Sequence, residues 1–483
     1  MVNFGQGYNP PGVYIEEDAT PLAANPIGGL PPQRVVLIGQ ASGKQSRTTQ
    51  IVLNTTSVVL PDKGIDTSTL SVTSVTTSTV VPSAEYTVTK GTPPSGGSTR
   101  DYTTTIKASA DKGPVWVTYS YTTPDYYSPT LMDSLDDIVS KYGAPFASDP
   151  SASVQVTSPI TLAAMLAFAN GAAQVVMAPY DAATTDATAV RTAIQTVYNR
   201  IATTYEDSII VPVPTGMASQ SNIQSIVGDL AGHLNAASTE GYFRVGVVGF
   251  PVTTPAAVPT STGITSPRVM VAYAAPEGLQ IFNSTTSQPI TIGHEYLAAA
   301  LAGRMAYLPV QKSLTREQMA GFSAIAGKAL SSGEKNSYSA AGITVLETDR
   351  NGRLIVRHAV STDTRSIFST EVSLTRARDT MISVLQSSLD QSGLIGDPID
   401  ENTPVAVKTI AAGALELCKG QDIIVDYSNL QVRQASALPS VIEVRFAYKP
   451  SFPLNYITVT FSVDLSMSTD PAITDVTETN AVA

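Results

Sequence analysis

The centre of the fold can be located from one segment, Arg34-Val35-Val36-Leu37-Ile38-Gly39. Its apolar residues are consecutive, and a glycine ends the run. A strand with one face in water alternates apolar and polar residues, whereas a continuous apolar run is typical of a strand that is covered on both faces. We therefore predict that residues 34–39 form a fully buried strand.

Downstream of residue 127 the sequence alternates between helix and strand patterns. Ser128-Pro129 and Ser158-Pro159 each place a capping serine before a proline, which favours a helix start. We expect the first helix to end at Gly143 and the second near Gly171. Three further strands and two helices are predicted, at residues 175–177, 188–203, 209–211, 221–235 and 245–248. This alternation predicts an α/β domain with a substantially parallel sheet.

The segment from residue 48 to residue 127 has a different composition. Of the 26 residues from Thr55 to Val80, 13 are Ser or Thr, and β-branched residues dominate. Such residues favour strands. We predict a small all-β module that is inserted into the larger α/β domain.

The last third changes character again. Asp349-Arg350-Asn351-Gly352 lies between two apolar runs, and its Asn-Gly pair predicts a tight hairpin with positive φ at both central positions. Helical patterns follow at residues 371–391 and 404–419, and strand patterns at 423–425 and 442–446. These elements predict a compact α+β domain.

Both ends of the chain carry isolated strand patterns. The first is Gly12, Val13, Tyr14, Ile15 and Glu16. In the second, residues 457–466 alternate strictly, with apolar side chains at every odd position: Ile457, Val459, Phe461, Val463 and Leu465. An unprotected strand edge is a template for pairing with another chain. We expect both ends to act as inter-subunit arms.

The sequence thus predicts a fold of the class α/β plus α+β: an α/β core, an inserted all-β module, a C-terminal α+β domain and two extended strand arms. The expected divisions are an N-terminal arm (1–33), the core (34–47 and 128–342), the β module (48–127), the C-terminal domain (343–455), and the C-terminal arm and polar tail (456–483).

Composition excludes several classes of function. The net charge of -11 argues against nucleic-acid binding, which needs a basic face. One cysteine and three histidines leave little for a metal site. Residues 1–11 resemble no secretory signal, and no apolar stretch is long enough to span a bilayer. We expect a protein without metal or cofactor that assembles in a reducing cytoplasm and does not insert into membranes.

Two local patterns resemble catalytic motifs but fail on spacing. Gly39 and Gly43 are separated by one residue too few for a nucleotide-binding loop, and Gln45 follows Lys44 where Ser or Thr is required. His294-Glu295 begins like a zinc-protease helix, but the second histidine is replaced by Ala298. No Gly-x-Ser-x-Gly elbow is present. We therefore expect no enzyme activity.

The opening Pro11-Gly12-Val13-Tyr14-Ile15-Glu16-Glu17 resembles the N-terminal signature of contractile phage tail sheath proteins, a family also found in related injection machines. The resemblance continues through residues 125–143, through Asn170-Gly171-Ala172, and through the C-terminal elements from the hairpin to the last strand. It covers most of the chain apart from the Ser/Thr-rich module.

The resemblance implies a structural subunit that forms stacked hexameric rings around an inner tail tube, contacts baseplate and terminator proteins, and contracts to drive the tube through the host envelope. It implies a virion protein that is assembled in the host cytoplasm. Residues 350–450 carry 11 basic and 11 acidic side chains, so they are relatively basic in an acidic chain. We expect this region to face the tube, with Arg376, Arg378, Lys408 and Lys419 as candidate contacts.

Two other classes of function remain open. A capsid-decoration or adhesin-type surface protein would account for the β module, although not for the long α/β core. A cytosolic α/β enzyme would account for the core, although it would need a polar cluster that the sequence does not reveal.

Overall fold

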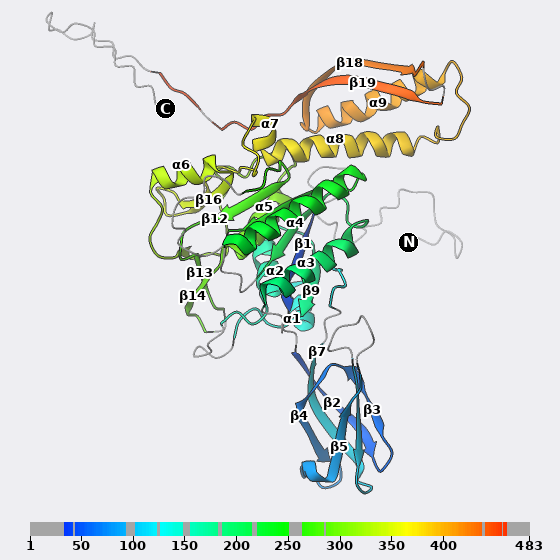
Figure 1. Cartoon of the computed structure of the whole chain (residues 1–483), viewed down its shortest axis with the longest axis vertical. Coiled ribbons are helices and arrows are strands. Elements are labelled where there is room, and N and C mark those ends of the chain that lie inside the picture. The colour runs from blue at the N-terminus through cyan, green and yellow to red at the C-terminus, as the bar shows by residue number, and fades with distance from the viewer. Residues whose placement is uncertain are drawn as a thin grey trace, which may run out of the picture.

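The computed structural model describes residues 33–41, 44–92, 102–122, 126–147, 155–181, 186–214, 220–250, 263–284, 286–436, 440–455 and 457–460. Figure 1 shows three parts along the long axis of the molecule. A central α/β body carries a β module at one end and a helix-and-hairpin layer at the other.

The body is built on one eight-stranded sheet. Its strands, in spatial order, are β17 (Leu354–Val356), β16 (Ile343–Thr348), β12 (Val269–Tyr273), β11 (Arg244–Gly249), β10 (Ser208–Val213), β1 (Arg34–Ala41), β9 (Val175–Asp181) and β8 (Thr130–Met132). The six inner strands are parallel, and the two edge strands are antiparallel to their neighbours. The predicted parallel sheet is confirmed.

Helices cover both faces of this sheet. On β1, Val35 and Leu37 face one core while Val36 and Ile38 face the other, because side chains alternate along a strand. The first core is closed by α1 (Leu135–Tyr142), α2 (Pro159–Ala169) and α5 (His294–Tyr307), and the second by α3 (Ala187–Ile201), α4 (Gln220–Thr239) and α6 (Ser332–Ala340). The prediction of a strand that is covered on both faces is confirmed.

The predicted helix start at Ser128-Pro129 is wrong. Residues 130–132 form edge strand β8, in which Leu131 pairs with Val176 of β9. Helix α1 begins later, and the Ser134 hydroxyl accepts a hydrogen bond from the Asp137 amide at 3.3 Å. The helix ends at Gly143 as predicted, with φ of 91°. An available sheet edge outweighed the local capping signal.

The inserted β module has a core of its own. Two three-stranded sheets, β2-β7-β4 and β3-β6-β5, enclose side chains that include Leu53, Ile106 and Tyr119. The strands are β2 (Lys44–Leu53), β3 (Val58–Lys63), β4 (Ile65–Ser74), β5 (Tyr86–Lys90), β6 (Thr103–Ala108) and β7 (Gly113–Thr122), with the short helix η1 (Ser83–Glu85). Because Lys44 already pairs with Thr122, the module begins at residue 44 and not at residue 48.

The hairpin at residues 343–356 corrects two predictions. Strand β16 pairs with β12 of the main sheet, so the hairpin belongs to the body and the C-terminal domain does not begin at residue 343. In the turn, the Gly352 amide donates to Asp349 O at 3.1 Å, and of the two residues Asn351 and Gly352 only Gly352 has positive φ. The Asp349 carboxylate accepts from the amides of Asn351 and Arg353, which holds this longer loop.

The C-terminal layer contains α7 (Ile367–Thr370), α8 (Val372–Asp390), α9 (Thr403–Gly420), and the antiparallel strands β18 (Ile424–Gln434) and β19 (Ile442–Pro450). Ala377 and Met381 of α8 pack with Leu415, Cys418 and Ile424 in a small core. A further small sheet is formed by β13 (Leu279–Phe282), β14 (Pro289–Ile292) and β15 (Ala324–Ile325), and it packs on the first core of the body.

Candidate inter-subunit surfaces

The C-terminal segment leaves its own subunit after β19 (Figure 1). Residues 457–460 form no strand here, and Leu454, Ile457 and Val459 are between 76% and 78% exposed. Apolar side chains along an extended segment gain free energy when another surface covers them. The predicted arm residues Phe461, Val463 and Leu465 lie outside the described residues, as do Gly12, Val13, Tyr14, Ile15 and Glu16 of the N-terminal arm.

The root of the C-terminal arm is fixed by polar contacts. The side-chain amide of Asn455 donates to the Glu371 carboxylate at 2.6 Å. Glu371 is buried and also bonds His358 Nε2 at 3.0 Å and the Ser313 hydroxyl at 3.3 Å. Close by, the ring of Phe452 packs against that of Phe368 on α7, with centroids 5.5 Å apart. Helix α7 and the N-cap of α8 therefore set the direction in which this arm departs.

The root of the N-terminal arm is held by Arg376. Its Nε donates to Gln33 Oε1 at 3.0 Å, and its Nη2 donates to the carbonyl oxygen of Met305 at 2.7 Å. Arg376 is only 3% exposed, and burial lowers its pKa to about 9. The prediction that Arg376 contacts the tube is therefore wrong for this side chain. The charge pattern of the sequence did not reveal that α8 turns this residue into the subunit.

Both arm roots meet the same end of one helix. Glu371 is the N-cap residue of α8, and Arg376 lies in its first turns. The N-terminal end of α8 therefore holds Asn455, just before the C-terminal arm, and Gln33, at the end of the N-terminal arm. A displacement of this helix relative to the body would move both arm roots together.

A buried ion pair fixes α8 to the body. Arg268, which precedes β12, forms a bidentate contact with Asp379 of α8, with Nη2 to Oδ1 at 3.0 Å. The Arg268 guanidinium also donates to the carbonyl oxygen of Arg244 at 3.1 Å. Because an unpaired buried charge is strongly destabilising, the two side chains must keep this contact, which holds α8 in place on the body.

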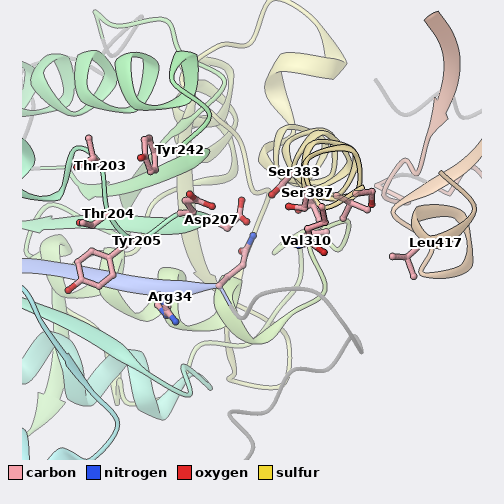
Figure 2. Close-up of a pocket in the computed structure, with 16 residues that line it drawn as sticks. Arg34, Thr203, Thr204, Tyr205, Asp207, Tyr242, Val310, Ser383, Ser387 and Leu417 are labelled. Carbon is pink, nitrogen blue, oxygen red and sulfur yellow. The ribbon is translucent and has the colours of Figure 1, made fainter. Parts of the chain in front are cut away.

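A polar cavity of about 540 Å³ lies between the body and α8 (Figure 2). Gln33, Arg34 and Asp207 line it from the body, and Ser383 and Ser387 line it from the helix. Burial, together with the charges of Glu206 and Asp379, raises the pKa of Asp207 to about 6. This carboxyl group therefore changes its charge within an ordinary range of pH, at the junction between the two parts.

The sheet formed by β18 and β19 has two strands, and its outer edges have no strand partner among the described residues. Side chains on one face pack on the α8–α9 core, including Tyr427, Leu430 and Phe446. Val425 and Tyr448 are exposed. A two-stranded ribbon is marginally stable alone, and added strands would complete it.

The other candidate tube contacts remain at the surface. Lys408 is exposed on α9, and Lys419 lies three turns farther along the same helix face. Lys419 pairs with Asp426 at 2.8 Å, and the half-exposed Arg378 lies 3.3 Å from Asp379. These three side chains can reach a partner, whereas Arg376 cannot.

The histidines occupy structural positions. Buried His294 Nδ1 bonds Phe250 O at 2.8 Å, and desolvation lowers its pKa to about 4. His233 stacks on Tyr198 and bonds Arg244. The described residues contain no group of three or more His, Cys, Asp or Glu arranged to hold a metal ion. Within the same described residues, no helix is long and apolar enough to span a membrane.

Sequence reasoning missed Gln33, Glu371 and Asn455. Nothing in their local sequence distinguishes them, since their partners lie 343 and 84 residues away along the chain. The sequence suggested Arg376 and Arg378 as tube contacts, but it did not reveal that Arg376 and Asp379 bond inward to the body.

Comparison with known proteins identifies relatives. No protein-family model matches the chain. The "Tail sheath protein" of Mycobacterium phage Bxz1 is 33% identical over 418 residues, which cover 84% of this chain and 69% of that protein.

Among solved structures, the fold is similar to the contracted helical sheath of the anti-feeding prophage, with a TM-score of 0.55 and 13% identity over 95% of this chain and all of that chain. It is also similar to the contracted sheath complex of the extracellular contractile injection system PVC, with a TM-score of 0.50 and 14% identity over 71% and 88% of the two chains. Identity and coverage in the phage relative, together with the shared fold, show that this chain belongs to the tail sheath protein family.

Proposed function

We propose that this chain polymerises around an inner tail tube as stacked hexameric rings and contracts to drive the tube through a host envelope. The observation that carries the proposal is made at the described start of the C-terminal arm, where Ile457 and Val459 belong to no strand and expose their apolar side chains. In the virion, the sleeve would meet baseplate and terminator proteins at its ends, after assembly in the host cytoplasm.

The arms are the proposed links between subunits. The two outer edges of the β18–β19 ribbon, which pair with no other strand of the described residues, are suitable acceptors for strands from neighbouring copies. Main-chain hydrogen bonds give such pairing its affinity, and alternate side chains fix its register. Such links can persist while the rings change their spacing, because each arm stays paired with its acceptor while its root moves with α8.

Contraction in this proposal needs no catalytic step. Extended and contracted lattices differ in how much surface the subunits bury, and burial of apolar area contributes about 25 cal/mol per Å². Summed over many subunits, a modest area per subunit supplies the work. The energy is stored during assembly and released when the lattice repacks.

The tube is proposed to contact the exposed basic side chains of the C-terminal layer, Arg378, Lys408 and Lys419. These residues belong to the relatively basic region of an acidic chain. Electrostatic docking of this kind depends on salt, since surface charges are screened over about 10 Å at 0.1 M ionic strength.

The test is electron microscopy of the purified chain. The intact protein is expected to form hollow cylinders, and deletion of residues 1–20 or 456–483 is expected to abolish them while the thermal unfolding midpoint stays unchanged. Cylinders that persist after both deletions would remove the arms from the mechanism. Particles attached singly to a capsid surface would favour a decoration protein, and thermal stabilisation by a nucleotide or sugar would favour an enzyme.

A further inference from the structure

A second cavity, of about 510 Å³, lies beside the root of the C-terminal arm. Its wall includes Arg316, Asn336, Ser339, Arg357, His358 and Asn455. None of the described residues that line it is an aspartate or a glutamate. We call it the basic cavity.

The charge behind this wall is unbalanced. One carboxylate oxygen of Glu347 lies 3.2 Å from Arg316 Nη1. The other oxygen contacts both Lys335 and Arg357, each at 3.0 Å. Three cations thus share one carboxylate. Burial alone would raise the pKa of Glu347, but Lys335 and Arg357 outweigh it and hold the pKa below its usual value. Glu371, which bonds the wall residues His358 and Asn455, is a second acid behind the wall. Three cations against two carboxylates still leave a surplus of positive charge at the cavity wall.

Two polar atoms in the wall need a partner. Ser339 Oγ and Asn455 Oδ1 are buried and have no hydrogen-bond partner among the described residues. An amide oxygen can only accept, so Asn455 Oδ1 requires a donor from the occupant. A simple anion such as phosphate suits the arginines but is a poor donor, whereas a peptide brings N–H groups together with its carboxylates.

The two terminal arms of this chain are purely acidic. Residues 1–33 contain Glu16, Glu17 and Asp18 and no lysine or arginine. Residues 456–483 contain Asp464, Asp470, Asp475 and Glu478, again without a basic residue. In an assembly of identical subunits, these segments are the acidic peptides present in the highest local concentration.

We propose that the basic cavity binds the acidic run Glu16-Glu17-Asp18 from the N-terminal arm of a second copy of this chain. The proposal rests on the sheath assembly proposed above and names where one arm docks. It places the N-terminal arm of one subunit beside the root of the C-terminal arm of another.

Spacing favours this run over the C-terminal acids. Arg316 and Arg357 both touch the Glu347 carboxylate, so their guanidinium groups are close together. In an extended peptide, residues i and i+2 point to the same side about 6.6 Å apart. Glu16 and Asp18 have this relationship, whereas the nearest C-terminal acids are three residues apart and the others five or six.

The first experiment is a charge swap in the full chain, with assembly followed by sedimentation and electron microscopy. The double variants Arg316→Glu/Arg357→Glu and Glu16→Lys/Asp18→Lys are each expected to raise the critical concentration for cylinder formation at least tenfold. Combining all four substitutions is expected to restore most of the loss. The arm variant leaves every residue of the cavity in place, so it remains informative if the cavity variant unfolds.

The control is Lys107→Glu/Arg350→Glu, which changes net charge equally at two exposed positions that do not line the cavity and is expected to leave assembly unaltered. If the parent chain forms no cylinders, the proposed function itself fails. If the parent assembles and the quadruple variant is no better than the worse double variant, docking at the basic cavity is wrong. Rescue by Asp464→Lys/Asp470→Lys instead would also refute the N-terminal occupant.

A direct measurement uses a fluorescent peptide of residues 11–20 and the full chain below its assembly concentration. Fluorescence anisotropy is expected to show binding that weakens at least tenfold with Arg316→Glu/Arg357→Glu and declines with salt. The same peptide with Lys at positions 16 and 18 serves as the matched control. Equal binding of both peptides would refute the proposal.

Discussion

The side-chain oxygen of Gln33 accepts a hydrogen bond from the buried guanidinium of Arg376, 343 residues farther along the chain. This contact joins the first described residue, at the end of the N-terminal arm, to helix α8. The same helix end holds Asn455 at the root of the other arm through Glu371. One helix therefore orients both segments with which the subunit is proposed to hold its neighbours.

Loss of the Arg376 side chain is expected to destabilise the subunit. Arg376→Ala leaves Gln33 Oε1 and Met305 O without their buried donor, which costs about 2 to 4 kcal/mol of unfolding free energy. Chemical denaturation measures this loss. Arg378→Ala, two positions along the same helix and half-exposed, is the matched control and should change the unfolding free energy by less than about 0.5 kcal/mol. Equal losses for both variants would contradict the anchoring role.

The contact between Asn455 and Glu371 is expected to control assembly more than folding. Asn455→Asp places a second carboxylate against the buried Glu371 and should release the arm root by charge repulsion. Cylinder formation should fall more in Asn455→Asp than in Asn455→Ala, with similar thermal midpoints for both. Unchanged assembly in Asn455→Asp would show that this contact does not direct the arm.

The buried pair Arg268 and Asp379 should behave non-additively. Arg268→Met leaves the buried Asp379 carboxylate with only the half-exposed Arg378 and is expected to cost about 3 to 5 kcal/mol, whereas Arg268→Met/Asp379→Leu should recover most of that loss. Urea denaturation of the parent, both single variants and the double variant gives the four unfolding free energies of a double-mutant cycle. Simple addition of the two single losses would mean that the pair does not act as a unit.

Asp207 is expected to make stability fall as pH rises. Its pKa is about 6 in the folded chain and near 3.8 when unfolded, so the folded state holds its proton more tightly. The stability that this provides is complete below about pH 4 and is lost as the pH rises to about 6.

Asp207→Asn removes this loss and should be more stable than the parent at pH 8, by up to about 3 kcal/mol, with no difference near pH 4. Asparagine also tolerates the positive φ of 52° at this position. Ser383→Ala removes a hydrogen bond that lowers the Asp207 pKa, so it should destabilise the chain at pH 8. Unfolding curves of the parent and both variants at pH 4, 6 and 8 test this prediction. A difference in unfolding free energy between parent and Asp207→Asn that does not change with pH would refute the raised pKa of Asp207.

Tube docking is expected to depend on the exposed cations and on salt. Arg378→Glu/Lys408→Glu/Lys419→Glu should abolish co-sedimentation of the chain with tubes at low salt, and the parent should lose binding progressively as salt rises. Salt-independent docking of the parent would exclude this surface. Lys107→Glu/Arg350→Glu again provides a charge control away from these helices.

The hairpin and α1 show where local sequence rules reached their limit. Asp349 to Gly352 form a turn as predicted, yet the Asp349 carboxylate selects a longer loop than the Asn-Gly pair alone favours. Ser128-Pro129 has the chemistry of a helix start, but pairing of Leu131 with β9 takes the following residues into the sheet. In both places a specific contact outweighed a preference of about 1 kcal/mol or less.

Hydrophobic periodicity was enough to predict the parallel sheet, most of its helices and the separate β module, because periodicity is a local property that each segment carries alone. The tail sheath family was indicated by the resemblance of short motifs such as residues 11–17. Packing was needed to show that Arg376 points inward, that one helix end holds both arm roots, and that Arg316 and Arg357 share a cavity with Asn455. Those relationships join residues far apart in the chain, and burial and pairing exist only once the segments have packed.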